Sequence, residues 1–207
     1  MRRRISLLVL LSLLCTLAAC HEADEPPAFA VDEAAITAAL EQTGLPGRIS
    51  EEETIVHEQG SPTYVVRDPD TTYNGTDNPV LIAGVCGTSY EGERMLLANF
   101  DQSVASAQIN WEDWKRQLAF AAVLYGALAD NEEIYRTFSA KEVPAGQDRC
   151  QWEAQLTNAY CVIKWSHRSS KTYDAAQFEV WKHSAGLWVN LYESQELYQK
   201  TVALRHE

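Results

Sequence analysis

The sequence is poor in positive charge and in cysteine. It contains 17 Lys and Arg residues against 29 Asp and Glu residues, which gives a formal net charge of −12. A surface with this imbalance repels phosphate backbones and anionic lipid headgroups, which argues against nucleic acid as a partner and against a basic membrane-binding patch. Five cysteines in 207 residues do not make a disulfide-dense miniprotein, and 46% apolar residues exclude a disordered acidic tail.

Motifs of the common enzyme classes are also missing. The segment that begins His57-Glu58 resembles the start of a zinc-protease motif, but Ser61 stands where the second histidine is required. There is no Gly-x-Ser-x-Gly turn and no phosphate-binding loop. Gly84-Val85-Cys86-Gly87 places a thiol between glycines, a pattern that an apolar strand end explains without a nucleophile. We therefore assign no catalytic residue, no metal ligand and no cofactor.

The first 20 residues have the pattern of a processing signal. Arg2, Arg3 and Arg4 precede an apolar run over residues 5–14, which is too short to cross about 30 Å of hydrocarbon. The run leads to Leu17-Ala18-Ala19-Cys20, which resembles the lipobox of bacterial lipoproteins. The resemblance implies cleavage before Cys20 and a diacylglyceryl thioether on its sulfur, with a further acyl chain such as palmitate on the new amino terminus. The alternative is an ordinary secretory signal that happens to contain a cysteine.

The resemblance also implies a location and a division of the chain. Residues 1–19 are the signal peptide, and their removal takes away three arginines and changes the formal charge from −12 to −15. Residues 20–30 form an acidic, proline-containing tether, and residues 31–207 form a single globular domain. A lipidated Cys20 anchors the domain on the extracytoplasmic face of the cell membrane, since two or more acyl chains bind stably. His21 is not the aspartate of inner-membrane retention, so the family pattern implies the outer membrane where a cell has one.

The hydrophobic periodicity alternates between helix and strand and predicts an α+β fold. A helix over residues 32–43, capped by Asp32 and stopped by Gly44, precedes strands over residues 53–58, 63–67, 80–86 and 93–100. A second set begins with a buried helix over residues 111–125 and a short helix around Ile134 and Phe138, and continues with strands over residues 150–156, 159–165, 177–183 and 187–193. The pattern predicts two helix-plus-four-strand units, about 31–103 and 110–207, with antiparallel sheets packed on a buried central helix.

Residue matches between the two units leave an internal duplication open as an alternative to chance. The matched positions keep nearly constant offsets: Ile36 with Ile134, Leu40 with Phe138, Tyr64 with Tyr160, Val66 with Val162, and Phe100 with Tyr192.

The hairpin over residues 150–165 has the clearest local geometry. If Thr157 and Asn158 form its turn, Ala154 pairs with Cys161 and Cys150 pairs with Trp165, so the two apolar faces coincide. Cys150 and Cys161 then lie about 13 Å apart along the strands, beyond the reach of a disulfide. We therefore predict that these two cysteines do not bond, and leave open whether Cys86 bonds either of them.

The opposite face of this second sheet is the candidate binding surface. Alternation predicts that Tyr160, Trp181, Trp188 and Tyr192 share one side with polar residues such as Lys164, Asn190 and His183. Aromatic rings beside hydrogen-bonding groups are typical of a recognition surface. The alternative is that these rings form a second core layer or belong to an ordinary sheet.

We therefore expect a lipid-anchored extracytoplasmic lipoprotein that binds a protein or a saccharide through sheet aromatics. An enzyme acting on envelope polymers and a purely structural adaptor remain as alternatives.

Overall fold

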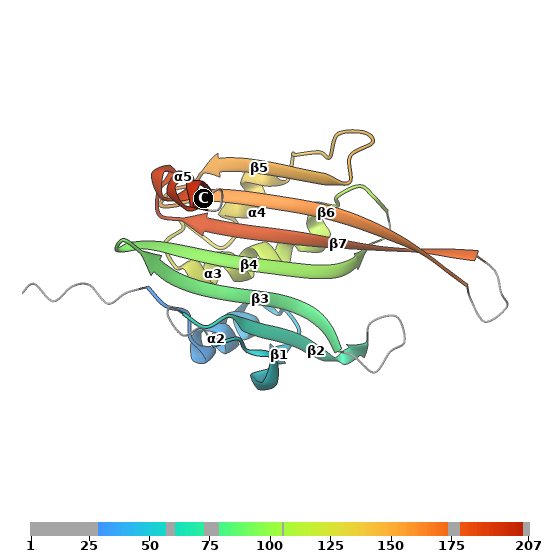
Figure 1. Ribbon diagram of the computed structural model, residues 1–207, viewed down its shortest axis with the longest axis horizontal. Helices are drawn as coiled ribbons and strands as arrows, with labels where there is room; N and C mark the ends of the chain where they lie inside the picture. Colours follow the sequence, from blue (N-terminus) through green and yellow to red (C-terminus); the bar gives the residue numbers. More distant parts are fainter. Residues whose placement is uncertain (1–28, 57–60, 73–78, 105, 174–178, 205–207) are drawn as a thin grey trace, which may run out of the picture.

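The computed structural model describes residues 29–56, 61–72, 79–104, 106–173 and 179–204, without the side chains of residues 71–72, 79–82, 171–173 and 179–182. Within these residues, seven antiparallel strands form one sheet in the order β1-β2-β3-β4-β7-β6-β5 (Figure 1). Their bounds are β1 (Arg48–Ile49), β2 (Tyr64–Thr72), β3 (Pro79–Tyr90), β4 (Glu93–Val104), β5 (Arg149–Gln155), β6 (Tyr160–Tyr173) and β7 (Glu179–Tyr192).

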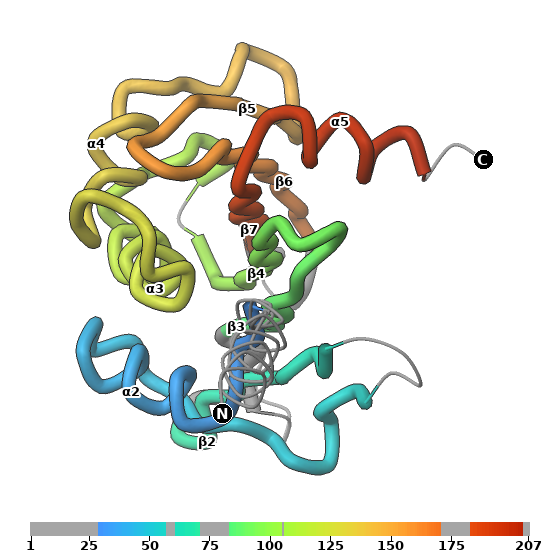
Figure 2. The backbone as a smooth tube through the Cα atoms, turned by 90° about the vertical axis from the view of Figure 1, so that its left-hand side faces the viewer, coloured from blue at the N-terminus to red at the C-terminus, as the bar shows by residue number. Residues whose placement is uncertain are grey.

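Helices lie on both faces of this sheet. Figure 2 shows α2, α3 and α4 on one side and α5 on the other. The helices are α2 (Glu33–Thr43), α3 (Lys115–Tyr125), α4 (Glu133–Phe138) and α5 (Gln195–Ala203), with 3-10 turns at η1 (Glu51–Glu53) and η3 (Trp111–Trp114).

Helix α2 begins and ends where the sequence predicts, whereas the helix predicted over residues 111–125 ends as predicted but begins only at Lys115, after the 3-10 turn η3. The Asp32 carboxylate accepts a hydrogen bond from the Ala35 amide at 2.7 Å, and Gly44 ends α2 with a positive φ of 63°. Helix α3 follows η3 directly and ends at Gly126, also with a positive φ. The Leu118 and Phe120 side chains of α3 are fully buried, as the absence of polar residues in this stretch predicts.

The main core lies between the sheet and the three helices on its covered face. Alternate residues of the central strands β4 and β7 point to this side and are almost completely buried. Phe100 of β4 packs edge-on against Phe120 of α3, with ring centroids 6.1 Å apart. The strands therefore have one apolar face, as the period of two predicts.

The prediction of two sheets of four strands packed on a central helix is wrong. Strands β4 and β7 pair antiparallel at every position from residue 95 to 104, opposite residues 192 to 183, and so join the two halves into one sheet. This pairing satisfies the backbone groups of two strands that would otherwise be exposed edges. The helices then lie beside a shared sheet and not between two sheets.

The second half has three strands and not the predicted four, and the first half has four strands of which one, β1, was not predicted. The segment around Gly186 is not a turn, because β7 continues through it and pairs Gly186 with Asp101 and with Ser166. In the first half, residues 53–56 of the strand predicted over residues 53–58 contain the end of η1 and a single bridge between Ile55 and Thr63, and residues 57–58 lie outside the described residues.

The apparent duplication does not correspond to equivalent positions in the sheet. Val66 belongs to the main core on the covered face, whereas Val162 packs in a second cluster on the other face. Phe100 and Tyr192 are separated in the same way. The strand matches therefore join residues on opposite faces and give no support to a repeated unit.

The hairpin prediction is confirmed. Ala154 pairs with Cys161 and Cys150 pairs with Trp165, around a turn at Thr157 and Asn158. The three described cysteines, Cys86, Cys150 and Cys161, are free thiols. This answers the open question about Cys86, which bonds neither of the others.

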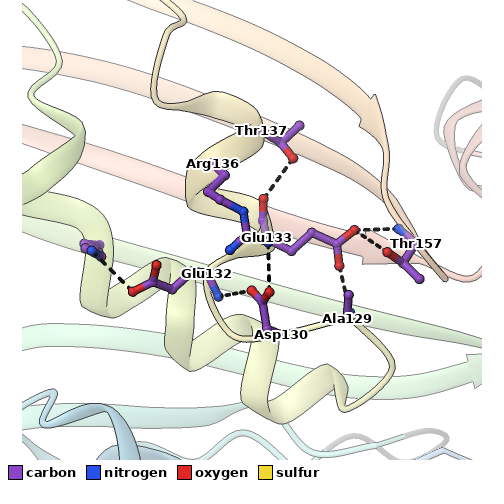
Figure 3. Close-up of polar contacts among 8 residues, drawn as sticks. Ala129, Asp130, Glu132, Glu133, Arg136, Thr137 and Thr157 are labelled. Carbon is purple, nitrogen blue, oxygen red and sulfur yellow. Dashed lines mark hydrogen bonds and ion pairs between the residues drawn. The ribbon is translucent and has the colours of Figure 1, made fainter.

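A half-buried carboxylate connects α4 to the turn of this hairpin (Figure 3). The Glu133 side chain accepts hydrogen bonds from the Ala129 amide at 2.8 Å and from the Thr157 amide and hydroxyl at 2.6 and 2.7 Å. Burial acts to raise the pKa of Glu133, but the hydrogen bonds from Thr157 and Ala129 outweigh it and lower the pKa. The charged form of Glu133 therefore fixes the β5 to β6 turn against the helix.

Candidate ligand-binding site on the open sheet face

The sheet face opposite α2, α3 and α4, here called the open face, carries the polar residues of the alternating strands. Strand pairing places Asn99, Trp188, Lys164 and Gln151 side by side across β4, β7, β6 and β5. The next row consists of Asp101, Gly186, Ser166 and Arg149. These rows bring together residues that are distant in the sequence.

Helix α5 covers one end of the open face, and two of the predicted site residues lie beneath it. Tyr160 and Tyr192 are only 6% and 1% exposed. Their rings lie 5.6 and 5.2 Å from the ring of Tyr198, and Leu197 and Val162 complete the cluster. Tyr160 and Tyr192 are thus core residues under α5 and do not share an exposed surface with Trp188.

Sequence reasoning missed α5 because the strand pattern was followed only as far as residue 193. The signal was present, since Ser194 is a preferred N-cap residue and Leu197 and Tyr198 begin a helical spacing. The Ser194 hydroxyl accepts a hydrogen bond from the Leu197 amide at 3.0 Å.

The two remaining predicted residues lie in β7. Trp188 is half-buried on the open face, whereas the side chain of Trp181 lies outside the described part of the chain. His183 lies on the covered face, where its Nδ1 is 3.1 Å from Nε2 of His167 and the His167 ring stacks on buried Trp165. The prediction that His183 shares the side of Trp188 is wrong because β7 is one continuous strand, in which odd and even positions keep their separate faces.

Gly186 provides the space in which the Trp188 ring lies. A Cβ atom at Gly186 would be 2.9 Å from Cη2 of Trp188 and 3.0 Å from a carboxylate oxygen of Asp101. The indole therefore lies over the backbone of its own strand, directly beside the position of Gly186. A side chain at this position would move the ring.

Two hollows flank Trp188, and both are lined in part by Ser166 and Arg168. The first, with a volume of about 770 Å³, extends toward β1, η1 and β2, and we call it the mixed-charge hollow. The second, of about 790 Å³, extends over β3, β4 and β5, and we call it the basic hollow. Both volumes lie in the range of about 300–1,000 Å³ that is typical of small-molecule sites.

The mixed-charge hollow contains compensated charges. Arg67 donates two hydrogen bonds to the Glu53 carboxylate, at 2.9 and 2.7 Å, and this pairing lowers the pKa of Glu53 to about 2. Asp101 is exposed at the surface, yet burial of its carboxyl by the surrounding residues raises its pKa, against the opposing charges of Arg168 and Arg67. Acids and bases thus balance in this hollow.

The basic hollow has a different composition. Its cationic side chains are Arg149, Lys164 and Arg168, and no Asp or Glu is among the described residues that line it. The uncharged polar groups are amides and hydroxyls, contributed by Thr63, Asn99, Gln151, Ser166 and Asn190. This lining can donate hydrogen bonds to an anion, and it can both donate hydrogen bonds to hydroxyl groups and accept hydrogen bonds from them.

Cys86 also lines the basic hollow but has no features of a nucleophile. Its thiol donates a weak hydrogen bond to the Ser61 carbonyl at 3.8 Å, and burial raises its pKa. A raised pKa keeps the group protonated near neutral pH. The flanking glycines have packing roles, because a Cβ at Gly84 would overlap the Asn99 side chain and a Cβ at Gly87 would overlap Val31.

No group of three or more metal-ligating side chains occurs among the described residues, and Cys20 and His57 lie outside them. The described part of the chain also contains no helix long and apolar enough to span a bilayer. Comparisons with family models, curated proteins and solved structures found no match.

Proposed function

We propose that this chain is a lipid-anchored lipoprotein of the cell envelope whose domain binds a ligand on the open face around Trp188. The anchor is supported by the sequence: a basic start, a short apolar run and Leu17-Ala18-Ala19-Cys20. Cys20 attaches the protein to the extracytoplasmic face of the membrane, and the acidic segment 20–30 separates the domain from the lipid.

One observation carries the binding proposal. Trp188 is half-buried between two hollows, on a part of the sheet that α5 leaves uncovered. An aromatic ring surrounded by amide, hydroxyl and guanidinium groups supplies contact area together with directional hydrogen bonds. The residues that would form a second core layer, Tyr160 and Tyr192, are already covered by α5 and leave this region open.

The binding proposal is tested by locating contacts on the processed chain in detergent micelles. Isotope-labelled protein is titrated with saccharides released from the envelope by partial hydrolysis, and the indole signal of Trp188 is assigned with a Trp188→Phe variant. We expect the Trp188 signal to shift while that of Trp152, which packs against Trp111 on the covered face, does not. Shifts confined to the covered face, or none at all, would refute the proposal.

The anchor has its own test with a matched control. Cys20→Ser removes the lipid acceptor, whereas Cys15→Ser changes another cysteine of the same signal and leaves Cys20 intact. We expect Cys20→Ser to abolish labelling by palmitate and to leave the signal of residues 1–19 uncleaved, while Cys15→Ser is labelled and cleaved like the parent chain. Equal labelling of the two variants would show that Cys20 is not the lipid site.

An enzyme acting on envelope polymers is the second candidate, and Asp101 is the observation in its favour. It is a carboxyl group with a raised pKa beside Trp188 in the mixed-charge hollow, as a general acid would be. The test measures release of reducing ends from envelope saccharides. If Asp101 is a general acid, the parent chain releases reducing ends and Asp101→Asn does not. If Asp101 only positions Arg67 and Arg168, the parent chain releases none.

A further inference from the structure

The basic hollow is unusual for the protein that contains it. The chain has a formal charge of −12, yet three cations surround this hollow and no carboxylate is among its described lining residues. Arg149, Lys164 and Arg168 form no ion pair within 4 Å among the described residues, unlike Arg67 with Glu53. Arg168 is shared with the mixed-charge hollow, where its charge also acts on Asp101, so Arg149 and Lys164 are the cations that belong to the basic hollow alone. A local excess of positive charge in an acidic protein favours an anionic ligand at this position.

The carboxylate on which the charge of Lys164 acts is directed elsewhere. Glu153 lies one row away in β5, and the charge of Lys164 contributes to lowering its pKa, after the larger effect of the Tyr160 hydrogen bond. Its carboxylate oxygens accept hydrogen bonds from Tyr160, Tyr198 and Gln151 under and beside α5. Glu153 is therefore engaged with α5, and the Lys164 ammonium remains available to the hollow.

We infer that the basic hollow binds the acidic group of a saccharide, a carboxylate or a phosphate, while Trp188 contacts the sugar ring. This inference rests on the proposed binding function of the open face and specifies its ligand. The guanidinium groups of Arg149 and Arg168 match the geometry of both anions, and Lys164 adds a point charge beside Trp188.

The lining favours a saccharide over a protein partner. Protein interfaces have an apolar centre that is depleted in lysine, whereas Lys164 is paired with Trp188 in the middle of the open face. The half-buried Asn99 amide can donate and accept hydrogen bonds, as the hydroxyl groups of a sugar do.

The test compares a galacturonic acid trisaccharide with a galactose trisaccharide of the same linkage, titrated calorimetrically into the processed chain at low salt. We expect the acidic sugar to bind at least about tenfold more tightly, and this preference to fall as salt is added. Galactose 6-phosphate and galacturonate, compared as monosaccharides, distinguish a phosphate from a carboxylate as the preferred anion, and preference for either over galactose supports the inference.

Charge variants assign the effect to the hollow. Lys164→Gln and Arg168→Gln should each weaken binding of the acidic trisaccharide about tenfold and leave binding of the neutral one unchanged. Lys141→Gln removes the same charge from an exposed position after α4 and should change neither.

Equal affinity for the two trisaccharides would overturn the inference and leave the proposed binding function standing on the Trp188 signal. Binding of neither would also overturn it. Triglutamate that binds as tightly as the acidic sugar, with the same dependence on Lys164, would overturn the choice of a saccharide in favour of an acidic peptide.

Discussion

Helix α5 is bound to the sheet by one fully buried side chain, and Leu197→Ala tests how independent this helix is. Leu197 is 0% exposed and packs against Tyr160, Val162 and Tyr192 on the open face. It is the buried residue of a nine-residue helix, which is too short to be stable alone in water. We therefore expect α5 to open more often when this contact is lost, with Tyr198 still in contact with Tyr160 and Tyr192 in the docked state.

The magnitude follows from the burial. Truncation of a buried leucine to alanine costs roughly 2–5 kcal/mol, and we take about 3 kcal/mol for Leu197. The state with α5 detached does not contain the Leu197 contact, so the whole of this roughly 3 kcal/mol is lost from the free energy of docking α5 onto the sheet. The equilibrium constant for local opening should therefore increase by about 100-fold. The sheet keeps its covered-face core, so its unfolding temperature should change little.

The assay is native-state hydrogen exchange, with Leu187→Ala as the matched control. Leu187 is also 0% exposed but lies in the main core of β7, so its truncation by the same chemistry should lower the Tm by about 6–12 °C for a domain of this size. For Leu197→Ala we expect faster exchange in residues 195–203 and unchanged protection in β4. Equal losses of Tm in the two variants would show that α5 unfolds together with the sheet and would refute the reasoning.

Three further outcomes can be measured. Glu133→Gln should destabilise the fold by about 1–2 kcal/mol, because the charged acceptor of the Thr157 and Ala129 hydrogen bonds is lost. Since the pKa of Glu133 is lowered in the folded state, its contribution to stability is present above the unfolded pKa of 4.5 and disappears as the pH falls through the folded pKa. Denaturant titrations at several pH values measure this loss, and a variant with the same pH profile of stability as the parent chain would contradict it. Gly186→Ala should displace the Trp188 indole at a cost of about 1–3 kcal/mol and weaken binding on the open face, and an unshifted indole signal would mean that the ring has room to spare. A maleimide applied to the folded chain should label the partly exposed Cys150 and leave Cys161 unmodified until denaturant is added, because Cys161 is fully buried and burial raises its pKa. Mass spectrometry of tryptic peptides measures the labelling, and modification of Cys161 before denaturant is added would show that the hairpin opens readily.

Local features of the fold could be predicted from the sequence because their determinants are neighbours in the chain. Asp32 and Gly44 mark the ends of α2, and a two-residue turn fixes which residues of β5 and β6 face each other. The same register placed Cys150 and Cys161 too far apart to bond, which the free thiols confirm.

The single sheet could not be predicted in this way. The contact that creates it joins β4 to β7, whose paired residues are about 80 to 97 positions apart, and no local pattern specifies which strand becomes the neighbour of another. The predicted break between the strands over residues 177–183 and 187–193 has a different origin, because it contains Gly186, which lies within a continuous strand and makes room for the ring of Trp188.

The candidate site was predicted only in part, because alternation along a strand shows which residues share a face but not which other elements cover that face. Alternation correctly placed Trp188 with Lys164 and Asn190 on one face. It could not show that α5 would return over Tyr160 and Tyr192, nor that Arg149 and Arg168 would meet across β5 and β6. Such groupings depend on tertiary placement and not on period.

The position of α5 determines how much of the aromatic face a ligand can reach. Trp188 and Tyr192 lie four residues apart on the same side of β7, about 13 Å along the strand, and Tyr160 is paired with Tyr192. With α5 docked, Leu197 seals the end that contains both tyrosines and leaves Trp188 with the basic hollow. If α5 detaches in Leu197→Ala, three rings become accessible on one face, and a neutral oligosaccharide should then gain affinity relative to an acidic one, because added ring contacts do not distinguish charge. An unchanged preference for the acidic trisaccharide in that variant would show that the ligand does not extend beyond Asn190.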